Sequence, residues 1–326
     1  MRSCGLWDGL PPQPGGWFEE VREVFCLNPG RIPERGKAVP DSSAMPTDYE
    51  SQQIAEIEHW MNHPPDLLSR VADSVLRPLT GLVAHVVPER AILAALDLGN
   101  AAGQSLARYQ SVKKHAGISH YSELLRGGLE RCDRLADSER HWAMGIAAAE
   151  GAVTGAAGLH GLPVDIPAVV AQAMRAVHIT ALCYGFELKG AEDGQLAIGI
   201  LSAGGANNMK EKAAALAYLR TLRVRSAKGA FERMAVEANE AAFSQQAVMF
   251  GAKALAEQLG MNFARRKAAQ SVPFLGAGIG ATVNAWYLHD VCHAARRTFQ
   301  ERWLHATGAL QHDIGPENPP VLPLKN

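Results

Sequence analysis

Two stretches rich in glycine and alanine constrain the fold of this chain more than any other feature of its sequence. They run over residues 143–186 and 272–299, and each contains two glycines four positions apart: Gly151 with Gly155, and Gly276 with Gly280. Residues four apart lie on one face of an α-helix, so each pair leaves a strip without side chains. Such a strip lets a second helix approach closely, and this contact can offset the roughly 1 kcal/mol that each glycine costs a helix. We therefore predict that both stretches are helical and pack against each other at the centre of the fold.

The rest of the chain between residues 48 and 306 also favours helices. Apolar residues and alanines recur with helical spacing in several further stretches, over residues 67–76, 92–106, 121–135, 208–223 and 230–259. No run alternates β-branched and polar residues as a half-buried strand would. The predicted fold class is therefore all-α, a compact globule of several helices around the two glycine-rich segments.

Particular residues mark two helix ends. Thr47 followed three positions later by Glu50 is the pattern of a capping box, which predicts a helix start at this point. That helix should stop before Pro64, because the residue preceding a proline disfavours helical geometry. Tyr184 followed by Gly185 predicts a second helix end, with Gly185 as its left-handed cap.

Both ends of the chain differ from the middle. Prolines and glycines interrupt residues 1–47, and residues 307–326 contain four prolines. We expect both ends to be flexible and predict one helical domain of residues 48–306 between them. Met45, just before the capping box, is an alternative start, and the first residues lack the apolar core of a secretory signal.

Charge and cysteine usage narrow the class of protein. The formal net charge is -1 and the pI is about 6.9, so the excess of basic residues that is typical of nucleic-acid binders is missing, and we expect no nucleic-acid partner. The five cysteines are scattered and contain no C-x-x-C pair, which argues against a disulfide framework or a zinc site. We therefore expect a reducing, cytoplasmic location.

The glycine-rich segments also raise the question of a membrane. The run between Lys267 and Asp290 is uncharged and about as long as the roughly 20 residues that a spanning helix needs. The first segment contains Glu150, Asp165 and Arg175, each of which costs about 2.5–3.5 kcal/mol at the centre of a bilayer. The mean hydropathy of -0.08 is that of a soluble protein. A soluble helical core is favoured, with peripheral or conditional insertion and stable spanning as alternatives.

Ordered blocks in both glycine-rich segments resemble the EcsC protein family. They comprise Gly151-x-x-x-Gly155, Asp165-Ile166-Pro167 and Tyr184-Gly185-Phe186, then residues 272–281, Asn284 and residues 294–299. The resemblance covers about residues 65–305. The family is poorly characterised, and its namesake accompanies the two components of an ABC transport system. The resemblance therefore implies a cytoplasmic or membrane-associated accessory protein, and it supplies no catalytic residues.

Four polar side chains stand out because they interrupt the glycine-rich segments: Glu150, Asp165, Arg175 and Asn284. Buried charges need partners, and Arg175 suits a carboxylate such as Glu150. An ion pair between packed helices is the structural interpretation, with Asp165 capping a helix N-terminus and Asn284 in a buried hydrogen bond. The functional interpretation is a pocket in which the same residues bind a polar ligand.

Histidines offer a weak metal candidate. His289 and His293 are four apart on one helix face, as a metal pair can be, and His59 and His63 repeat the spacing. Twelve histidines make chance pairs common, so we expect no metal site. Residues 276–281 match a dinucleotide fingerprint but lack the strand before it, and no P-loop motif occurs, so no cofactor is expected.

Three functional hypotheses follow. The first, which the resemblance implies, is a non-enzymatic accessory protein at the cytoplasmic membrane face. Its partner would be a membrane transporter, or the membrane surface itself through a lipid-like ligand. The second is a hydrolase with an acidic pocket around Glu150 and Asp165, and the third is a soluble helical scaffold.

Overall fold

The computed structural model describes residues 45–65, 109–155, 162–189, 191–228, 251, 253–255, 257–262, 276–311 and 314. Helices make up 81% of the described chain, and no strand occurs in it. The predicted all-α class is confirmed. The helices expected over residues 67–76, 92–106 and most of 230–259 lie outside the described residues, and the division at residues 47 and 306 stays a prediction.

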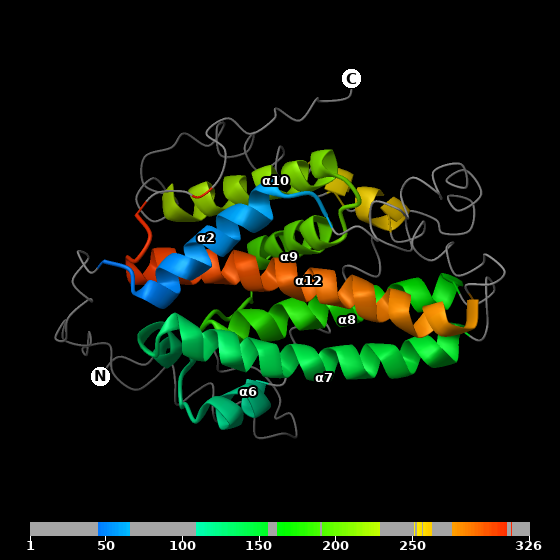
Figure 1. The fold of residues 1–326 in the computed structure, drawn as a ribbon, viewed down its shortest axis with the longest axis horizontal. Coiled ribbons are helices and arrows are strands. Elements are labelled where there is room, and N and C mark those ends of the chain that lie inside the picture. Colours follow the sequence, from blue (N-terminus) through cyan, green and yellow to red (C-terminus); the bar gives the residue numbers. More distant parts are fainter. Residues whose placement is uncertain are drawn as a thin grey trace, which may run out of the picture. The chain divides into compact units, whose positions relative to one another are not determined.

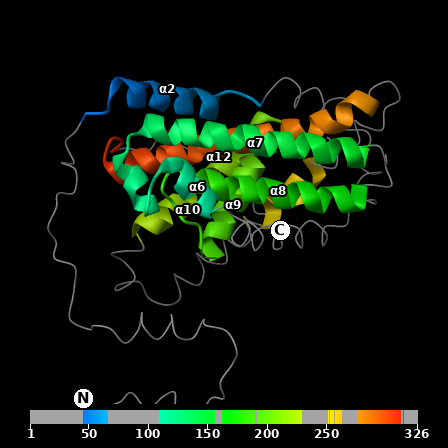
Figure 2. The same ribbon diagram turned by 90° about the horizontal axis from the view of Figure 1, so that it is seen from below.

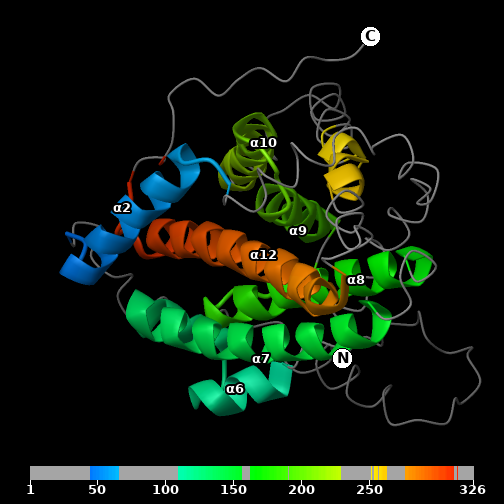
Figure 3. The same cartoon turned by 45° about the vertical axis from the view of Figure 1, so that its right-hand side comes forward.

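The long helix α12 (Gly276–Thr307) organises the fold. It packs against α7 (Leu129–Gly155), α8 (Leu162–Cys183) and α9 (Ala191–Gly204). Figures 1 and 3 show α12 running between the pair α7 and α8 on one side and α9 on the other. Its buried face contributes Tyr287, Phe299 and Leu304 to the apolar core.

Four further elements complete the described structure. Helix α10 (Met209–Lys228) packs against α9, and helix α6 (Tyr109–Ala116) packs against α8. The short 3-10 helix η2 (Tyr121–Arg126) contacts α7, α8 and α12. Helix α2 (Asp48–Asn62) lies alongside α12 and α7, as Figure 2 shows.

Helix α2 begins and ends as its sequence predicts. The Thr47 hydroxyl accepts a bond from the Glu50 backbone N–H at 3.2 Å, and the Glu50 carboxylate accepts one from the Thr47 N–H at 2.8 Å. This reciprocal pair is the predicted capping box. The helix ends at Asn62, two residues before Pro64, and buries Ile57 and Met61 on the face toward the core.

The predicted cap after α8 is also confirmed. Gly185 has a φ of 88°, its N–H bonds to the Leu182 carbonyl at 3.0 Å, and the Phe186 N–H bonds to the Ala181 carbonyl at 2.9 Å. These two bonds define a Schellman motif. A Cβ at Gly185 would lie 2.9 Å from the Tyr121 carbonyl oxygen, so the position requires glycine for space as well as for conformation.

The continuous helix expected over residues 121–135 is wrong. The chain forms η2 up to Arg126, breaks at Gly127 and Gly128, and starts α7 at Leu129. Gly128 has a φ of 83°, a conformation that L side chains rarely adopt. Apolar periodicity alone does not detect this break, because Leu124 and Leu129 are both buried on either side of it.

Apart from the turn at residues 184–186, both glycine-rich segments are helical where the structure describes them, and the helices that contain them pack together. Gly151 and Gly155 belong to α7, and Gly276 and Gly280 belong to α12, which contacts α7 extensively. What these four glycines contact lies outside the described residues, so packing through the glycine faces themselves stays a prediction. Among the described helices, none combines the length and apolar character that crossing a bilayer requires.

A glycine that the sequence did not single out makes a close approach between helices. A Cβ placed on Gly204, at the end of α9, would lie 2.7 Å from the Val291 Cα and 2.9 Å from the Asp290 carbonyl oxygen of α12. These are backbone atoms, which cannot rotate away as a flexible side chain can. Gly204 therefore sets the distance between α9 and α12.

Candidate functional site

The structure describes only part of the predicted polar pocket. Glu150 lies in α7, Asp165 in α8 and Asn284 in α12, but their side chains are outside the described residues. Arg175 lies in the middle of α8 and is half-buried. Asp165 is the fourth residue of α8, which begins at Leu162. It therefore lies inside the helix and is not its N-cap, so the predicted capping role is wrong. The predicted pocket itself stays a prediction.

The main polar centre of the described core is Asp133, a residue of α7 that is only 2% exposed. The Tyr49 hydroxyl of α2 donates to its Oδ2 at 2.6 Å, and the Tyr184 hydroxyl, just after α8, donates to its Oδ1. The Gln300 amide of α12 donates to both oxygens, at 2.8 and 2.9 Å. One carboxylate thus joins α2, α7, α12 and the end of α8.

Two arginines of α12 extend this network. Arg296 Nη2 lies 3.3 Å from Asp133 Oδ2, and Arg296 Nη1 donates to both Asp137 oxygens at 3.0 Å. Arg297 donates to the side-chain oxygens of Gln53 at 3.0 Å and Glu56 at 2.6 Å, both on α2. We call Asp133, Asp137, Arg296, Arg297, Gln300, Tyr49, Tyr184, Gln53 and Glu56 the Asp133 network.

The electrostatic surroundings of Asp133 keep its tyrosine and arginine partners protonated, so that they can donate hydrogen bonds. Burial and the neighbouring Asp133 charge raise the pKa of the Tyr184 hydroxyl well above its usual value, so that it remains a donor. Burial and the hydrogen bond to Asp133 also raise the pKa of the Tyr49 hydroxyl. Burial alone would lower the pKa of Arg296, but the Asp133 charge raises it. Each of these groups therefore keeps its bonding role across the physiological pH range.

The described cysteines are unsuited to nucleophilic chemistry. Cys132, Cys183 and Cys292 are buried. Burial raises the pKa of the Cys132 and Cys292 thiols to about 12, and it raises the pKa of Cys183 well above its usual value. Only the thiolate is strongly nucleophilic, so these residues act as small apolar side chains.

The histidine pair of α12 does not form a metal centre with other described residues. His289 and His293 stack with their ring centroids 6.5 Å apart, and Trp60 of α2 packs edge-on against His293 at 6.1 Å. In the described part of the chain no group of three His, Cys, Asp or Glu side chains is close enough to hold a metal. His293 instead belongs to the packing between α2 and α12.

His293 makes stability depend on pH. Burial lowers its pKa from 6.5 to about 3, and Arg297, His289 and Arg296 of α12 and Lys212 of α10 act in the same direction. Between these two pH values the unfolded chain binds a proton that the folded protein does not. The His293 contribution therefore makes the folded state less stable as the pH falls through this window.

The corresponding variant is His293→Gln. We expect it to flatten the slope of unfolding free energy against pH between about pH 4 and about pH 6, by at most about 1.4 kcal/mol per pH unit. Urea unfolding at several pH values measures the slope. His120→Gln, which changes an exposed imidazole, is the matched control. An unchanged slope in His293→Gln would show that the proton is taken up elsewhere.

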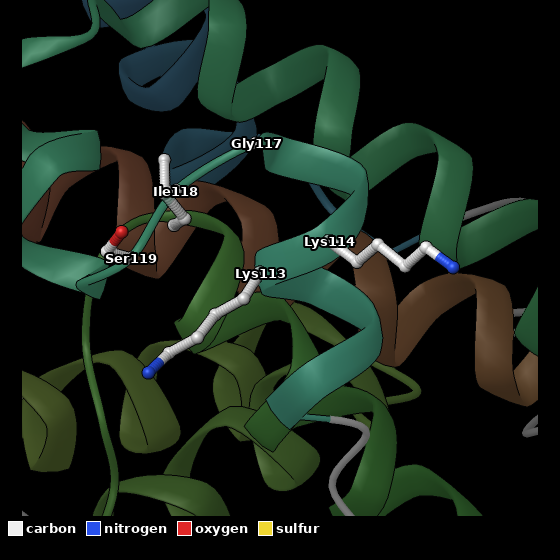
Figure 4. A pocket seen from close by; sticks show the side chains of 5 residues that line it. All are labelled: Lys113, Lys114, Gly117, Ile118 and Ser119. Carbon is white, nitrogen blue, oxygen red and sulfur yellow. The ribbon is translucent and has the colours of Figure 1, made fainter.

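A second candidate site lies on the surface, where the chain passes from α6 to η2. Residues 113–120, which we call the basic turn, contain two lysines, two histidines and no acidic residue. Lys113, Lys114, Gly117, Ile118 and Ser119 line a shallow hollow of about 430 Å³. Figure 4 shows the two lysine amines pointing in different directions from its rim. The hollow therefore lacks the converging donors of a tight phosphate site.

Comparison with known protein families decides the affiliation of the chain. A family model described as the EcsC protein family matches residues 51–304. The chain belongs to the EcsC protein family. Comparisons with curated proteins and with solved structures found no match. The EcsC match extends from α2 into the last turn of α12 and therefore includes most of the Asp133 network and the whole basic turn.

The sequence around Asp133 contains a signal for the Asp133 network that the prediction above does not include. Leu129, Cys132, Asp133 and Ala136 have the spacing of one helix face, and the other three are apolar. An acid inside an otherwise apolar stripe indicates a buried carboxylate with specific partners. Its partners come from positions as far apart as Tyr49 and Gln300, which only the fold brings together.

Proposed function

We propose that this EcsC protein is a non-enzymatic accessory protein that binds the lipid surface at the cytoplasmic face of a membrane, where a transporter would be its partner. The observation that carries the proposal is a contrast among the described residues. The charged groups of the Asp133 network are bonded to one another and to neighbouring polar side chains, whereas Lys114 of the basic turn is exposed.

The interior supports a structural role over a catalytic one. Asp133 is 2% exposed and accepts bonds from two tyrosines and a glutamine, so a substrate would have to displace them. A general base needs access to the proton that it removes. The buried thiols lack the lowered pKa of a nucleophile. These groups are better suited to holding α2, α7 and α12 in place.

Two further observations support a place at a membrane. The resemblance to the EcsC family implies an accessory protein beside a transport system, and the exposed Lys114 of the basic turn offers a cation to an anionic surface. A peripheral protein attaches in this way, by charge and without a spanning segment. Attachment by charge should be reversible and sensitive to salt.

Liposome flotation tests the proposal. We expect the purified protein to float with vesicles that contain phosphatidylglycerol at low ionic strength, and to stay behind with vesicles of phosphatidylcholine alone. A soluble scaffold or a soluble hydrolase would float with neither. Absence of flotation with the anionic vesicles at low salt would therefore overturn the proposed function.

A further inference from the structure

We infer that the basic turn is the docking face, and that its occupant is a bilayer surface of anionic lipid. The inference rests on the proposed function and adds the part of the molecule that makes contact. It starts from the charges. Lys113 and Lys114 lie in the last turn of α6, and Arg131 of α7 reaches the turn, where its Nη2 donates to the Ala116 carbonyl at 2.5 Å.

Two acidic side chains near the basic turn bond to residues of the turn itself. Glu123 of η2 is exposed, but its Oε1 accepts the backbone N–H groups of Ser119 at 3.0 Å and His120 at 2.7 Å. The buried Glu139 lies 3.2 Å from His115 Nδ1. Within the described part of the chain, Lys114 has no carboxylate partner, and Lys113 lies over the Tyr121 ring at 5.0 Å. The lysines are therefore available to an outside anion.

The turn is held firmly enough to present these charges. The Ile118 N–H bonds to the Lys113 carbonyl at 3.1 Å, which closes the end of α6. On the other side of the turn, the Trp303 indole N–H of α12 bonds to the Leu124 carbonyl of η2 at 3.2 Å. The cations thus sit on a surface attached to the core, and docking there would require little ordering of the chain.

The shape of the turn favours a broad anionic surface over a single small anion. A free phosphate is held best by donors that converge on it. In Figure 4 the amines of Lys113 and Lys114 diverge across the rim of the hollow, and the Ser119 hydroxyl lies on another side. Divergent cations can each meet a different headgroup, and each lysine near an anionic leaflet contributes independently to binding.

Cations at a helix C-terminus also stabilise the helix dipole, which would explain Lys113 and Lys114 without a partner. The two explanations differ in what a charge reversal changes. A purely structural role predicts lower thermal stability and unchanged lipid binding. A docking role predicts that lipid binding falls while the protein remains folded.

The test is flotation of the full chain with phosphatidylglycerol vesicles at low ionic strength. We expect the double variant Lys113→Glu with Lys114→Glu to bind at least about tenfold more weakly than the wild type. The matched control is Lys210→Glu with Lys253→Glu, two exposed lysines on α10 and in the 253–255 helical stretch, which changes the net charge by the same amount. The control should bind nearly as well as the wild type. Circular dichroism verifies that both variants are folded.

The outcomes separate the two proposals. If the wild type floats and the turn variant floats equally well, the basic turn is not the docking face, although the proposed function stands. If the control loses as much vesicle affinity as the turn variant, then the net charge of the protein determines binding and the position of the lysines does not. That result would also overturn the inference. If the wild type does not float, both proposals fall. Should the double variant unfold, Lys114→Glu alone, at an exposed side chain, replaces it, and an unchanged affinity overturns the inference.

Discussion

Replacing Asp133 by asparagine is expected to lower the free energy of unfolding by about 3–5 kcal/mol. The substitution keeps the shape of the side chain but removes its charge, and it places an amide N–H₂ where only donors approach. The hydroxyls of Tyr49 and Tyr184 and the amide of Gln300 would then compete for one remaining oxygen. Arg296 would keep Asp137 as its only carboxylate in the described network. Urea unfolding followed by circular dichroism measures the change.

Glu130→Gln is the matched control for this prediction. Glu130 is exposed on the same helix and pairs with Arg134 at 2.5 Å across one helical turn. Exposed pairs of this kind contribute at most about 1 kcal/mol, so the midpoint of unfolding should barely move. Equal effects of the two substitutions would contradict the role assigned to Asp133, because burial and shared partners would then make no difference.

Gly204→Ala is expected to destabilise the protein by at least about 2 kcal/mol. The added methyl group would lie 2.7 Å from the Val291 Cα and 2.9 Å from the Val291 nitrogen, well inside van der Waals contact. Because both atoms belong to the backbone of α12, α9 must move away as a unit and weaken its packing. Thermal unfolding of the purified variant measures the loss.

Gly145→Ala separates this steric effect from the ordinary effect of removing a glycine. Gly145 is an exposed residue of α7, and nothing lies within 4 Å of a Cβ placed on it. Alanine is the better helix former by about 1 kcal/mol, so this variant should be as stable as the wild type or more stable. A Gly204→Ala variant that behaved like Gly145→Ala would show that α9 and α12 are farther apart than the structure places them.

Local rules predicted the parts of the fold that depend on neighbours in sequence. The capping box at Thr47 and Glu50 and the left-handed cap at Gly185 depend on residues within a few positions of one another, and both are confirmed. The all-α class followed from composition and periodicity. The break at Gly127 and Gly128 was missed because the leucines on both sides of it face the same core.

The Asp133 network could not be assembled from the sequence. Tyr49, Asp133 and Gln300 are separated by 84 and 167 positions, and nothing in the chain indicates which polar residues will meet. Gly204 is similar, because a single glycine near a helix end resembles an ordinary cap until the neighbouring helix is placed. Tertiary packing determines both, whereas the prediction of a polar pocket at Glu150, Asp165 and Asn284 depends on their neighbours in the sequence alone.

The Asp133 network and the basic turn are expected to have different roles. The Asp133 network holds α2 against α7 and α12. Asp133 and Gln300 at its centre are buried, whereas Glu56 and Asp137 at its edge are partly exposed, and we expect the buried centre to contribute most to stability. In the basic turn, Ala116 and Ile118 pack against the core, whereas the side chain of Lys114 is exposed and can meet a partner. Variants of the first kind should therefore change unfolding, and variants of the second kind should change binding.

The dependence of vesicle affinity on ionic strength tests most directly the claim that this EcsC protein works at an anionic membrane surface. The dissociation constant for phosphatidylglycerol vesicles should rise steeply as salt is increased from about 0.05 M to about 1 M, where the screening length falls to about 3 Å. Affinity that did not change with salt, or that was equal for phosphatidylcholine vesicles, would contradict the account.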